Sequence, residues 1–345
     1  MTLTLASEFA RSGIPTHFVV ASGEGPLRDV IPPEVTLVDL QRSKTRSALI
    51  GLASYLSRFR PRALITSKTH VNVIAIIANL VSRSRTHLIV CEHSRFQFEE
   101  SRGVRSAVVL SLAKRFYPLA SHIVAVAPSV AQACSIRLNL QLERIQVIPN
   151  PVFDDELHRR LEEPVHPPGL GENGFLYLGV GRLVPEKDFN TLIRSFQKVA
   201  QTIRSRLIIL GEGPERPELE ELIDDLGLAQ SVALPGQVDN PLVYMREADA
   251  FVLSSRSEGF PMVLVEAMYA GNLIIATTCS DSISTILEGG RYGTLVPVGA
   301  VEALADAMVA VAQGPPPDVT AARARVQERY GVEKIASLYK ALITD

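Results

Sequence analysis

Hydrophobic residues recur along the chain in two alternating patterns. Short runs rich in Val, Ile and Leu are typical of buried strands, and the stretches between them place apolar residues at helical spacings of three and four. In the first half, strands are expected at residues 16–21, 35–40, 63–66, 87–91, 122–126 and 145–148. Helices are expected between them at residues 47–59, 71–81, 104–117 and 129–138. This order predicts parallel strands joined by crossover helices.

The same alternation resumes at residue 175. Strands are expected at residues 175–180, 206–210, 232–234, 250–253, 273–276 and 294–296, with helices at 189–202, 215–226, 241–247, 261–270 and 301–312. The fold class is therefore α/β, with two facing doubly wound Rossmann-like domains. A proline- and glycine-rich stretch separates the halves and is too broken for a connection inside one domain. The predicted parts are an N-terminal domain over 1–152, a hinge over 153–174, a second domain over 175–314 and C-terminal helices over 315–345, the last packing back on the first domain.

The start of the chain departs from this pattern. A doubly wound domain normally opens with a strand, whereas this one opens with an amphipathic helix that places Leu3, Ala6 and Phe9 on one face. Gly13 occupies the position that ends such a helix. The first strand of the N-terminal domain and the loop after it are therefore expected to be missing.

Length, cysteine content and charge narrow the class of protein. The 345 residues suit two domains, and the three separated cysteines argue against a disulfide framework, a zinc site or a thioredoxin-type motif. No apolar run approaches the roughly 20 residues of a membrane span, and the N-terminus lacks the basic region of a signal peptide. We therefore expect a cytoplasmic protein. Residues 1–155 hold 18 Lys and Arg against 11 Asp and Glu, so a basic first half balances an acidic second half within a net charge of −2.

The most informative segment runs from residue 248 to 271 and contains Glu258-Gly-Phe-Pro and, eight residues after Glu258, Glu266. A strand ends near Ser254, and Pro261 marks the first turn of the next helix. The free N–H groups of a helix N-terminus at this sheet edge bind phosphate, and flanking carboxylates accept hydrogen bonds from sugar hydroxyls. This arrangement suits a nucleotide sugar. The alternative is that the two glutamates are a solvated cap and an exposed helix residue.

Three further loops follow strands of the second half. Arg182 and Lys187 follow the strand at 175–180 and could clamp a diphosphate, although Lys187 could instead pair with Glu186 or Asp188. Leu210-Gly-Glu-Gly-Pro and Leu234-Pro-Gly lie at the next two strand ends, where most glycines are ordinary turn residues. The four loops nevertheless fall on one edge of a single predicted sheet.

These motifs resemble those of the retaining family 4 (group 1) glycosyltransferases of GT-B fold, a group with many bacterial polysaccharide and lipid-sugar transferases. They run from residue 175 to about 297, and Cys-Glu-His-Ser and Ile-Pro-Asn-Pro-Val extend the resemblance to residues 87–152. The resemblance implies that Arg182 and Lys187 bind the donor diphosphate, that Glu258 binds the transferred sugar and that Glu266 binds the ribose. It implies that His93 reaches the donor sugar as a catalytic residue. The alternative is that His93 is a capping or core residue. It also implies a phosphate- and sugar-lining segment of Gly259, Phe260, Pro261, Met262 and Val263, and a nucleotide-base loop of Gly211, Gly213, Gly236, Gln237 and Val238.

The resemblance further implies transfer of a hexose from a nucleoside-diphosphate sugar with retention of configuration. Cations and helix N–H groups aimed at the departing diphosphate would stabilise its charge, so no metal and no cofactor are expected. Ser282, Ile283 and Thr285 stand where relatives usually carry Gly-Pro and Glu. The missing first strand carries the glycine-rich loop of relatives, so the chain as it stands is expected to transfer poorly.

The acceptor side offers charge rather than a motif. Three basic clusters lie in the first half: Arg42, Lys44 and Arg46; Arg58, Arg60 and Arg62; Arg102, Arg105, Lys114 and Arg115. They suit either an anionic membrane surface on the inner face of the cell membrane or an ordinary solvated face. The acceptor is thus expected to be a saccharide or lipid-linked saccharide, and a nucleic-acid partner is not expected with 6% aromatic residues and no Trp. The alternatives are a catalytically silent nucleotide-sugar-binding subunit and a nucleotide-sugar epimerase.

Overall fold

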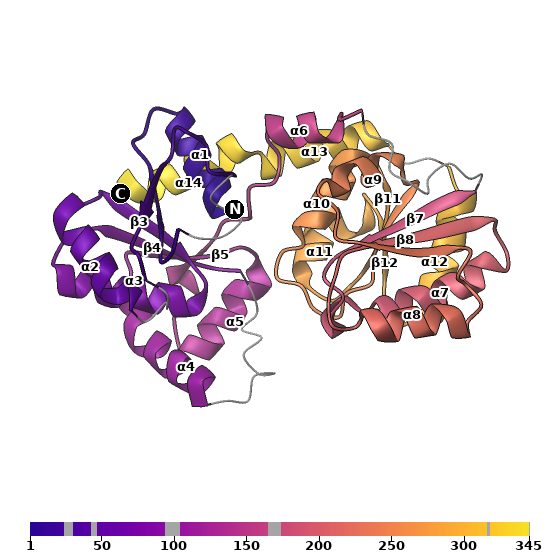
Figure 1. The fold of residues 1–345 in the computed structure, drawn as a ribbon, viewed down its shortest axis with the longest axis horizontal. Coiled ribbons are helices and arrows are strands. Elements are labelled where there is room, and N and C mark those ends of the chain that lie inside the picture. Colours follow the sequence, from indigo (N-terminus) through magenta and orange to yellow (C-terminus); the bar gives the residue numbers. More distant parts are fainter. Residues whose placement is uncertain (24–29, 43–46, 94–103, 165–173, 316–317, 345) are drawn as a thin grey trace. The chain divides into compact units, whose positions relative to one another are not determined.

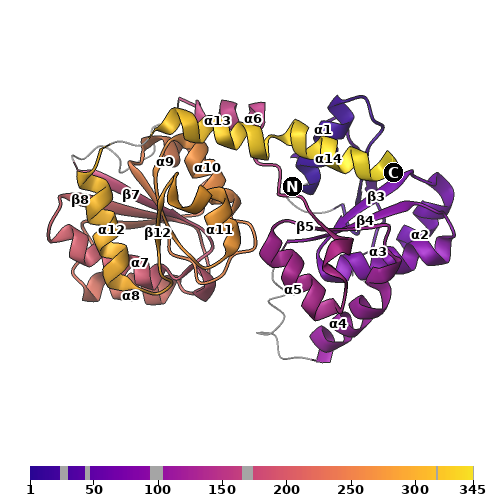
Figure 2. The same ribbon diagram turned by 180° about the vertical axis from the view of Figure 1, so that it is seen from behind.

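The computed structural model describes residues 1–23, 30–42, 47–93, 104–164, 174–315 and 318–344. The chain divides into two compact units (Figures 1 and 2). Unit 1 comprises Met1–Pro151 and Tyr330–Asp345, and unit 2 comprises Val152–Arg329. All twelve strands expected from the sequence are present and every strand pair is parallel, which confirms the α/β class.

Unit 1 is built on two parallel sheets. A two-stranded sheet pairs β1 with β2, and a four-stranded sheet has the order β3-β4-β5-β6. In the described residues no strand precedes α1, and β1 and β3 pair on one side only. The elements in chain order are α1 (Thr2–Arg11), β1 (His17–Val20), β2 (Thr36–Asp39), α2 (Ala48–Phe59), β3 (Ala63–Ser67), α3 (Thr69–Ser82), β4 (His87–Glu92), α4 (Val104–Phe116), β5 (His122–Ala125), α5 (Pro128–Leu138), β6 (Ile145–Val147) and α14 (Val332–Thr344).

The first and last helices of the chain lie side by side in unit 1 (Figures 1 and 2). Gly13 has φ +77°, the left-handed conformation expected after the end of α1. Leu5 and Phe9 of α1 and Tyr339 of α14 are buried in one cluster with Ile89 of β4. Helices α1 and α14 thus share the hydrophobic core of the four-stranded sheet.

Unit 2 is one six-stranded parallel sheet of order β12-β11-β10-β7-β8-β9. Helices α7, α8 and α12 cover one face, and α9 and α10 lie on the other (Figure 1). The elements are α6 (Asp155–Leu161), β7 (Phe175–Val180), α7 (Phe189–Ala200), β8 (Ser205–Leu210), α8 (Arg216–Asp225), β9 (Val232–Gly236), α9 (Pro241–Glu247), β10 (Ala250–Leu253), α10 (Met262–Ala270), β11 (Leu273–Thr277), α11 (Asp281–Ile286), β12 (Thr294–Val296), α12 (Val301–Gln313) and α13 (Val319–Tyr330).

Two local features differ from the sequence expectations. The segment 153–174, expected as a hinge, contains helix α6, which Asp154 caps by accepting a hydrogen bond from the Leu157 N–H at 2.8 Å. Helix α6 packs on α9, so this part of the segment belongs to unit 2. Helix α10 begins at Met262, and Pro261 is its N-cap rather than its first residue.

None of the helices in the described ranges is long and apolar enough to cross a membrane.

Candidate functional site

The sheet of unit 2 reverses its direction of winding between β7 and β10. From β7 the chain adds β8 and β9 on one side, and then returns to place β10, β11 and β12 on the other. The loops that follow β7 and β10 therefore diverge from a shared point at the carboxyl edge of the sheet. In open α/β sheets this switch point is where ligands bind. The two sequence motifs with Lys187 and Glu258 follow these two strands.

Lys187 and Glu258 form an ion pair at the switch point. The Lys187 Nζ lies 2.6 Å from the Glu258 Oε1, and the two side chains are only 20% and 11% exposed. The sequence left open that Lys187 pairs with Glu186 or Asp188. Asp188 instead binds Arg256, with 2.9 Å between its Oδ2 and the arginine Nε, and accepts hydrogen bonds from Thr191 at the start of α7. The lysine is thus directed to the carboxylate of the neighbouring loop.

Neighbouring groups fix both members of this pair. The Ser254 hydroxyl donates to the Lys187 carbonyl oxygen at 2.8 Å, and the Ser255 hydroxyl donates to the Glu258 Oε1 at 2.7 Å. The lysine side chain passes Gly181 so closely that a Cβ there would lie 3.2 Å from its Cδ and Cε atoms. Gly181 therefore serves to admit the lysine stem. Sequence reasoning did not single out the two serines, because serines after a strand are common and carry no spacing signal.

The glycines after β8 pack against the loop after β7. A Cβ on Gly211, which has φ +138°, would lie 1.9 Å from the Gly181 carbonyl oxygen, and one on Gly213 would lie 2.2 Å from the Leu183 carbonyl oxygen. Gly236 has φ +90° at the end of β9, and its carbonyl oxygen accepts from the Gly211 N–H at 2.8 Å. The close approach that these glycines permit is therefore between neighbouring loops. Gln237 and Val238 continue directly from Gly236 along the same edge.

The N-terminus of α10 lies beside the ion pair. It begins with Met262 and Val263 after the segment of Gly259, Phe260 and Pro261, and no side chain caps it. Its first N–H groups carry the partial positive charge of a helix N-terminus. Glu266, one turn into α10, forms no hydrogen bond or ion pair with the described residues. Burial raises the pKa of Glu266, and the positive charge of Arg160 opposes that rise.

Arg160 is a residue that sequence reasoning missed, because it lies in the segment expected to be a hinge. Helix α6 carries it to the loop before α9, where its Nη2 donates to the Asp239 carbonyl oxygen at 2.7 Å. Its charge also acts on Glu266. Arg182, by contrast, is exposed, and no ion pair or hydrogen bond joins its guanidinium to the described residues.

His93 lies at the carboxyl edge of the sheet of unit 1, directly after β4. Burial lowers the pKa of its imidazole to about 4, and its Nε2 is buried without a partner among the described residues. Two more buried polar atoms at this edge lack partners among the described residues: the Ser129 hydroxyl at the start of α5 and the Asn150 Oδ1 after β6. This edge therefore holds polar groups whose hydrogen-bonding capacity is unused.

Glu92, the last residue of β4 and the neighbour of His93 in the chain, is buried. Its carboxylate forms no ion pair with the described residues. Its carboxylate accepts hydrogen bonds from Thr69, from Asn72 and from the Tyr117 hydroxyl. Burial nevertheless raises the pKa of Glu92 to about 7. The network joins α3, β4 and the turn after α4, and it fixes the strand end from which His93 projects.

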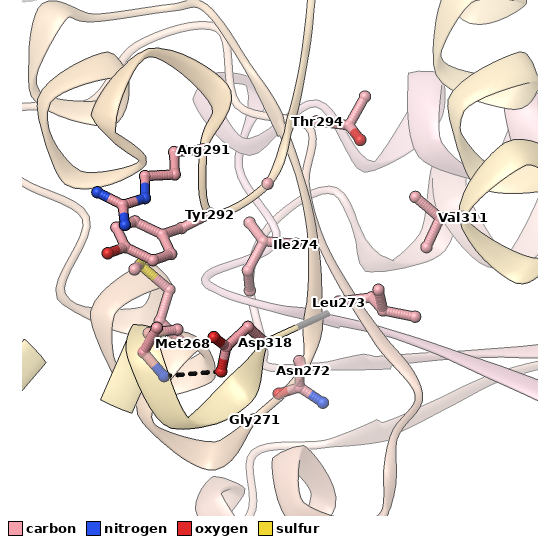
Figure 3. A pocket seen from close by; sticks show the side chains of 13 residues that line it. Met268, Gly271, Asn272, Leu273, Ile274, Arg291, Tyr292, Thr294, Val311 and Asp318 are labelled. Carbon is pink, nitrogen blue, oxygen red and sulfur yellow. Dashed lines mark hydrogen bonds between the residues drawn. The ribbon is translucent and has the colours of Figure 1, made fainter. Parts of the chain in front are cut away.

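Helix α11 and a cavity are two further features of unit 2. Ser282, Ile283 and Thr285, which stand where relatives usually carry Gly-Pro and Glu, form part of α11. The Ser280 and Ser282 hydroxyls are hydrogen-bonded at 2.7 Å. A cavity of about 180 Å³ opens at the amino ends of β11 and β12, lined by Asn272, Arg291, Tyr292 and Asp318 among others (Figure 3). It lies at the opposite end of these strands from the carboxyl edge. In the described ranges no group of three or more His, Cys, Asp or Glu is placed to hold a metal ion.

Comparison with known families covers nearly the whole chain. Residues 163–329 match the model described as glycosyl transferases group 1, and residues 1–156 match that of Glycosyltransferase Family 4. The chain therefore belongs to the group 1, family 4 glycosyltransferases.

Individual relatives are more distant. An uncharacterized glycosyltransferase of Methanocaldococcus jannaschii is 27% identical over 67% of this chain and 59% of its own length. The N-acetylgalactosamine-N,N'-diacetylbacillosaminyl-diphospho-undecaprenol 4-alpha-N-acetylgalactosaminyltransferase of Campylobacter jejuni is 34% identical over 35% of this chain and 33% of its own. The matched part thus spans less than two thirds of each relative.

Solved structures agree over the whole fold. HepE of Anabaena, solved with UDP and glucose, superimposes with a TM-score of 0.80 at 20% identity, covering 99% of this chain and 94% of the other. The lipopolysaccharide outer core galactosyltransferase WaaB gives a TM-score of 0.76 at 18% identity, with coverage of 99% and 94%. The fold is therefore GT-B, as the sequence motifs indicated.

Proposed function

We propose that the protein transfers a hexose from a nucleoside-diphosphate sugar to a saccharide or lipid-linked saccharide with retention of configuration. The observation that carries this proposal is the Lys187–Glu258 ion pair, held at the switch point of unit 2 beside an uncapped helix N-terminus. A cation, a carboxylate and free N–H groups at one place suit a ligand that is anionic at one end and rich in hydroxyls at the other.

Binding of the donor would exchange the partners of this pair. A diphosphate in the switch-point crevice offers Lys187 a more highly charged partner, and the exposed guanidinium of Arg182 can add a bidentate contact. Glu258, released from the lysine, can accept hydrogen bonds from hydroxyls of the transferred sugar. The N-terminal residues of α10, Met262 and Val263, would direct their N–H groups at the phosphate.

The remaining residues fit the nucleoside and the reacting sugar. Glu266 has an unused carboxylate for ribose hydroxyls, and the loop at Gly236, Gln237 and Val238 is proposed to contact the base. His93 is proposed to reach the donor sugar with its unpartnered Nε2. Its lowered pKa keeps the ring neutral at pH 7, so it can act as a hydrogen-bonding group without adding charge.

The chemistry of transfer follows from these groups. When the glycosyl C–O bond breaks, negative charge collects on the departing diphosphate. Lys187, Arg182 and the α10 N–H groups are proposed to face that position, which would lower the energy of the transition state. The departing phosphate oxygen can accept the proton of the acceptor hydroxyl on the same face of the sugar, which retains configuration. A divalent ion is not required for this scheme.

The names of similar proteins support the substrate classes. HepE was solved with UDP and glucose, and the C. jejuni relative is named for a diphospho-undecaprenol acceptor. We therefore propose a role in bacterial cell-surface polysaccharide or glycolipid synthesis. The proposal includes a cytoplasmic location, peripheral on the inner face of the membrane. A silent nucleotide-sugar-binding subunit shares the donor site but would not transfer.

A panel of donors tests the proposal. UDP, GDP and ADP, each with and without an attached hexose, are added to the protein and the melting temperature is followed. One base should stabilise the protein by about 2.7 kcal/mol at 100 times its dissociation constant. The donor of that base is then incubated with lipid-linked saccharides, and the anomeric configuration of the product is read by NMR. Stabilisation without transfer would indicate the silent subunit, and no stabilisation by any donor would refute the donor site.

A further inference from the structure

The amino edge of the four-stranded sheet in unit 1 is formed by the four segments that lead from helices into strands. They are the ends of α2, α3, α4 and α5 with the turns that precede β3, β4, β5 and β6. Adjacent strands start within two residues of one another, since Ala63 pairs with His87, Ile89 with His122, and Ile123 with Ile145. A hydrogen bond from the Ser57 hydroxyl to the Ser82 carbonyl oxygen, 3.3 Å long, also joins the ends of α2 and α3. The four segments therefore form one continuous surface.

This surface, which we term the basic edge, consists of residues 58–62, 80–86, 114–121 and 139–145. It contains a single carboxylate, that of Glu143. All of its residues are described, and its lysine and arginine side chains are exposed and form no ion pair with the described residues. They are Arg58, Arg60, Arg62, Arg83, Arg85, Lys114, Arg115 and Arg144. The basic edge therefore carries a strong, uncompensated positive charge.

Large apolar side chains lie exposed among these cations. Val81 is 65% exposed, Leu80 50%, Leu119 49% and Phe59 48%. The Arg58 guanidinium lies over the Phe59 ring, 5.3 Å from its centroid. Exposed apolar groups surrounded by cations are typical of surfaces that enter the interface of an anionic membrane.

Three arginines of the basic edge occupy backbone positions that favour glycine. Arg60 and Arg83 follow the ends of α2 and α3 with φ +44° and +52°, and Arg85 has φ +58°. In this left-handed region a side chain is disfavoured, and glycine is the usual residue after a helix. Glycine at these positions would give the fold equal or greater stability. The arginine side chains therefore indicate a role other than folding.

We propose that the basic edge docks unit 1 on an anionic lipid bilayer. The inference rests on the proposed function for the purpose of docking, which is to bring the enzyme to a lipid-linked acceptor, and for the role of His93. The cations would attract the charged headgroups, and Phe59, Leu80 and Val81 would enter the headgroup region. A nucleic acid would use the charge but would leave the aliphatic side chains of Leu80 and Val81 without a partner.

Docking in this orientation also restricts the acceptor. His93 lies at the carboxyl edge of the same sheet, at the other end of β4. The six residues of β4 span about 20 Å at roughly 3.3 Å per residue. With the basic edge on the lipid, the reacting hydroxyl must lie at about that height. This favours saccharide chains that project from the bilayer over a sugar attached directly at its surface.

Glycine substitutions separate docking from folding. The double variant Arg60→Gly/Arg83→Gly removes two cations of the basic edge at positions that accept glycine. Gln41→Gly is the matched control. Gln41 also has a left-handed backbone, with φ +53°, but it follows the carboxyl end of β2 and is not part of the basic edge. Both variants should keep or raise the melting temperature, because both relieve left-handed backbone.

Binding is measured by co-sedimentation with vesicles of phosphatidylcholine containing about one third phosphatidylglycerol. The double variant should bind about 30-fold more weakly than the parent, at about 1 kcal/mol for each arginine near the surface, and Gln41→Gly should bind like the parent. Binding should also fall in high salt and on vesicles without the anionic lipid. Equal binding by the double variant, or tighter binding to a DNA duplex than to the vesicles, would refute the proposal. Stabilisation by nucleoside diphosphates without vesicles reports the donor site independently.

Discussion

The ion pair between Lys187 and Glu258 should contribute measurably to the stability of unit 2. Replacing Lys187 by Met keeps the stem that packs against Gly181 but removes the charge. The Glu258 carboxylate, 11% exposed, would keep its hydrogen bond from the Ser255 hydroxyl. Breaking a fully buried pair costs about 3 to 5 kcal/mol, and an exposed pair is worth less than about 1. For this partly buried pair we expect a loss of about 2 kcal/mol.

A double-mutant cycle isolates the pair itself. Glu258→Gln retains hydrogen-bonding capacity, so it should cost about 1 kcal/mol, and adding it to Lys187→Met should cost little more than the lysine variant alone. Free energies come from urea unfolding followed by circular dichroism, with each unit allowed its own transition. Lys198→Met is the control, because its ion pair with Glu302 is 45% and 74% exposed. If Lys187→Met behaves like Lys198→Met and the coupling is near zero, the reasoning about this pair is wrong.

Two further predictions concern groups that the ion pair does not include. The pKa of Glu92 is raised to about 7 in the folded protein. Between about pH 4.5 and 7 the folded protein therefore holds a proton on Glu92 that the unfolded chain has lost. The contribution of Glu92 to the free energy of unfolding falls as the pH rises through this range. Glu92→Gln should therefore gain about 2 to 3 kcal/mol relative to the parent between pH 4.5 and 8 in urea titrations, and a constant difference would contradict the buried carboxyl. Arg160→Ala should weaken nucleoside diphosphate binding about tenfold by calorimetry, because it removes the cation that acts on Glu266. The neighbouring Arg159, 64% exposed and paired with Glu156, provides the control Arg159→Ala, and equal effects of the two would refute a role for Arg160.

The strands and the edge that carries the site could be predicted from the sequence. Buried parallel strands read as short apolar runs, and the loops with Lys187 and Glu258 each follow such a run. The pairing of these two residues could not be predicted, because Glu186 and Asp188 are nearer in sequence and equally acidic. Only the strand order, which places β10 beside β7, brings Glu258 to the lysine.

Helix α6 was missed for a related reason. Its seven residues lie in a segment rich in proline and charge, which is typical of a linker. The helix is stabilised by its Asp154 cap and by tertiary contacts with α9 rather than by a long apolar repeat. Arg160 lies on this helix and was therefore not predicted as a site residue. The basic edge was predicted in part, since Arg58 and Lys114 belong to basic clusters visible in the sequence. That these clusters meet Arg83 and Arg144 on one edge follows only from the strand order of the sheet.

The central claim is that Lys187 at the switch point binds the diphosphate of the donor. Isothermal titration of the stabilising nucleoside diphosphate into the parent, Lys187→Met and Lys198→Met tests it most directly. Loss of one charge-assisted contact of about 2 kcal/mol predicts roughly 30-fold weaker binding to Lys187→Met and unchanged binding to Lys198→Met. Equal affinity of all three proteins would contradict the claim.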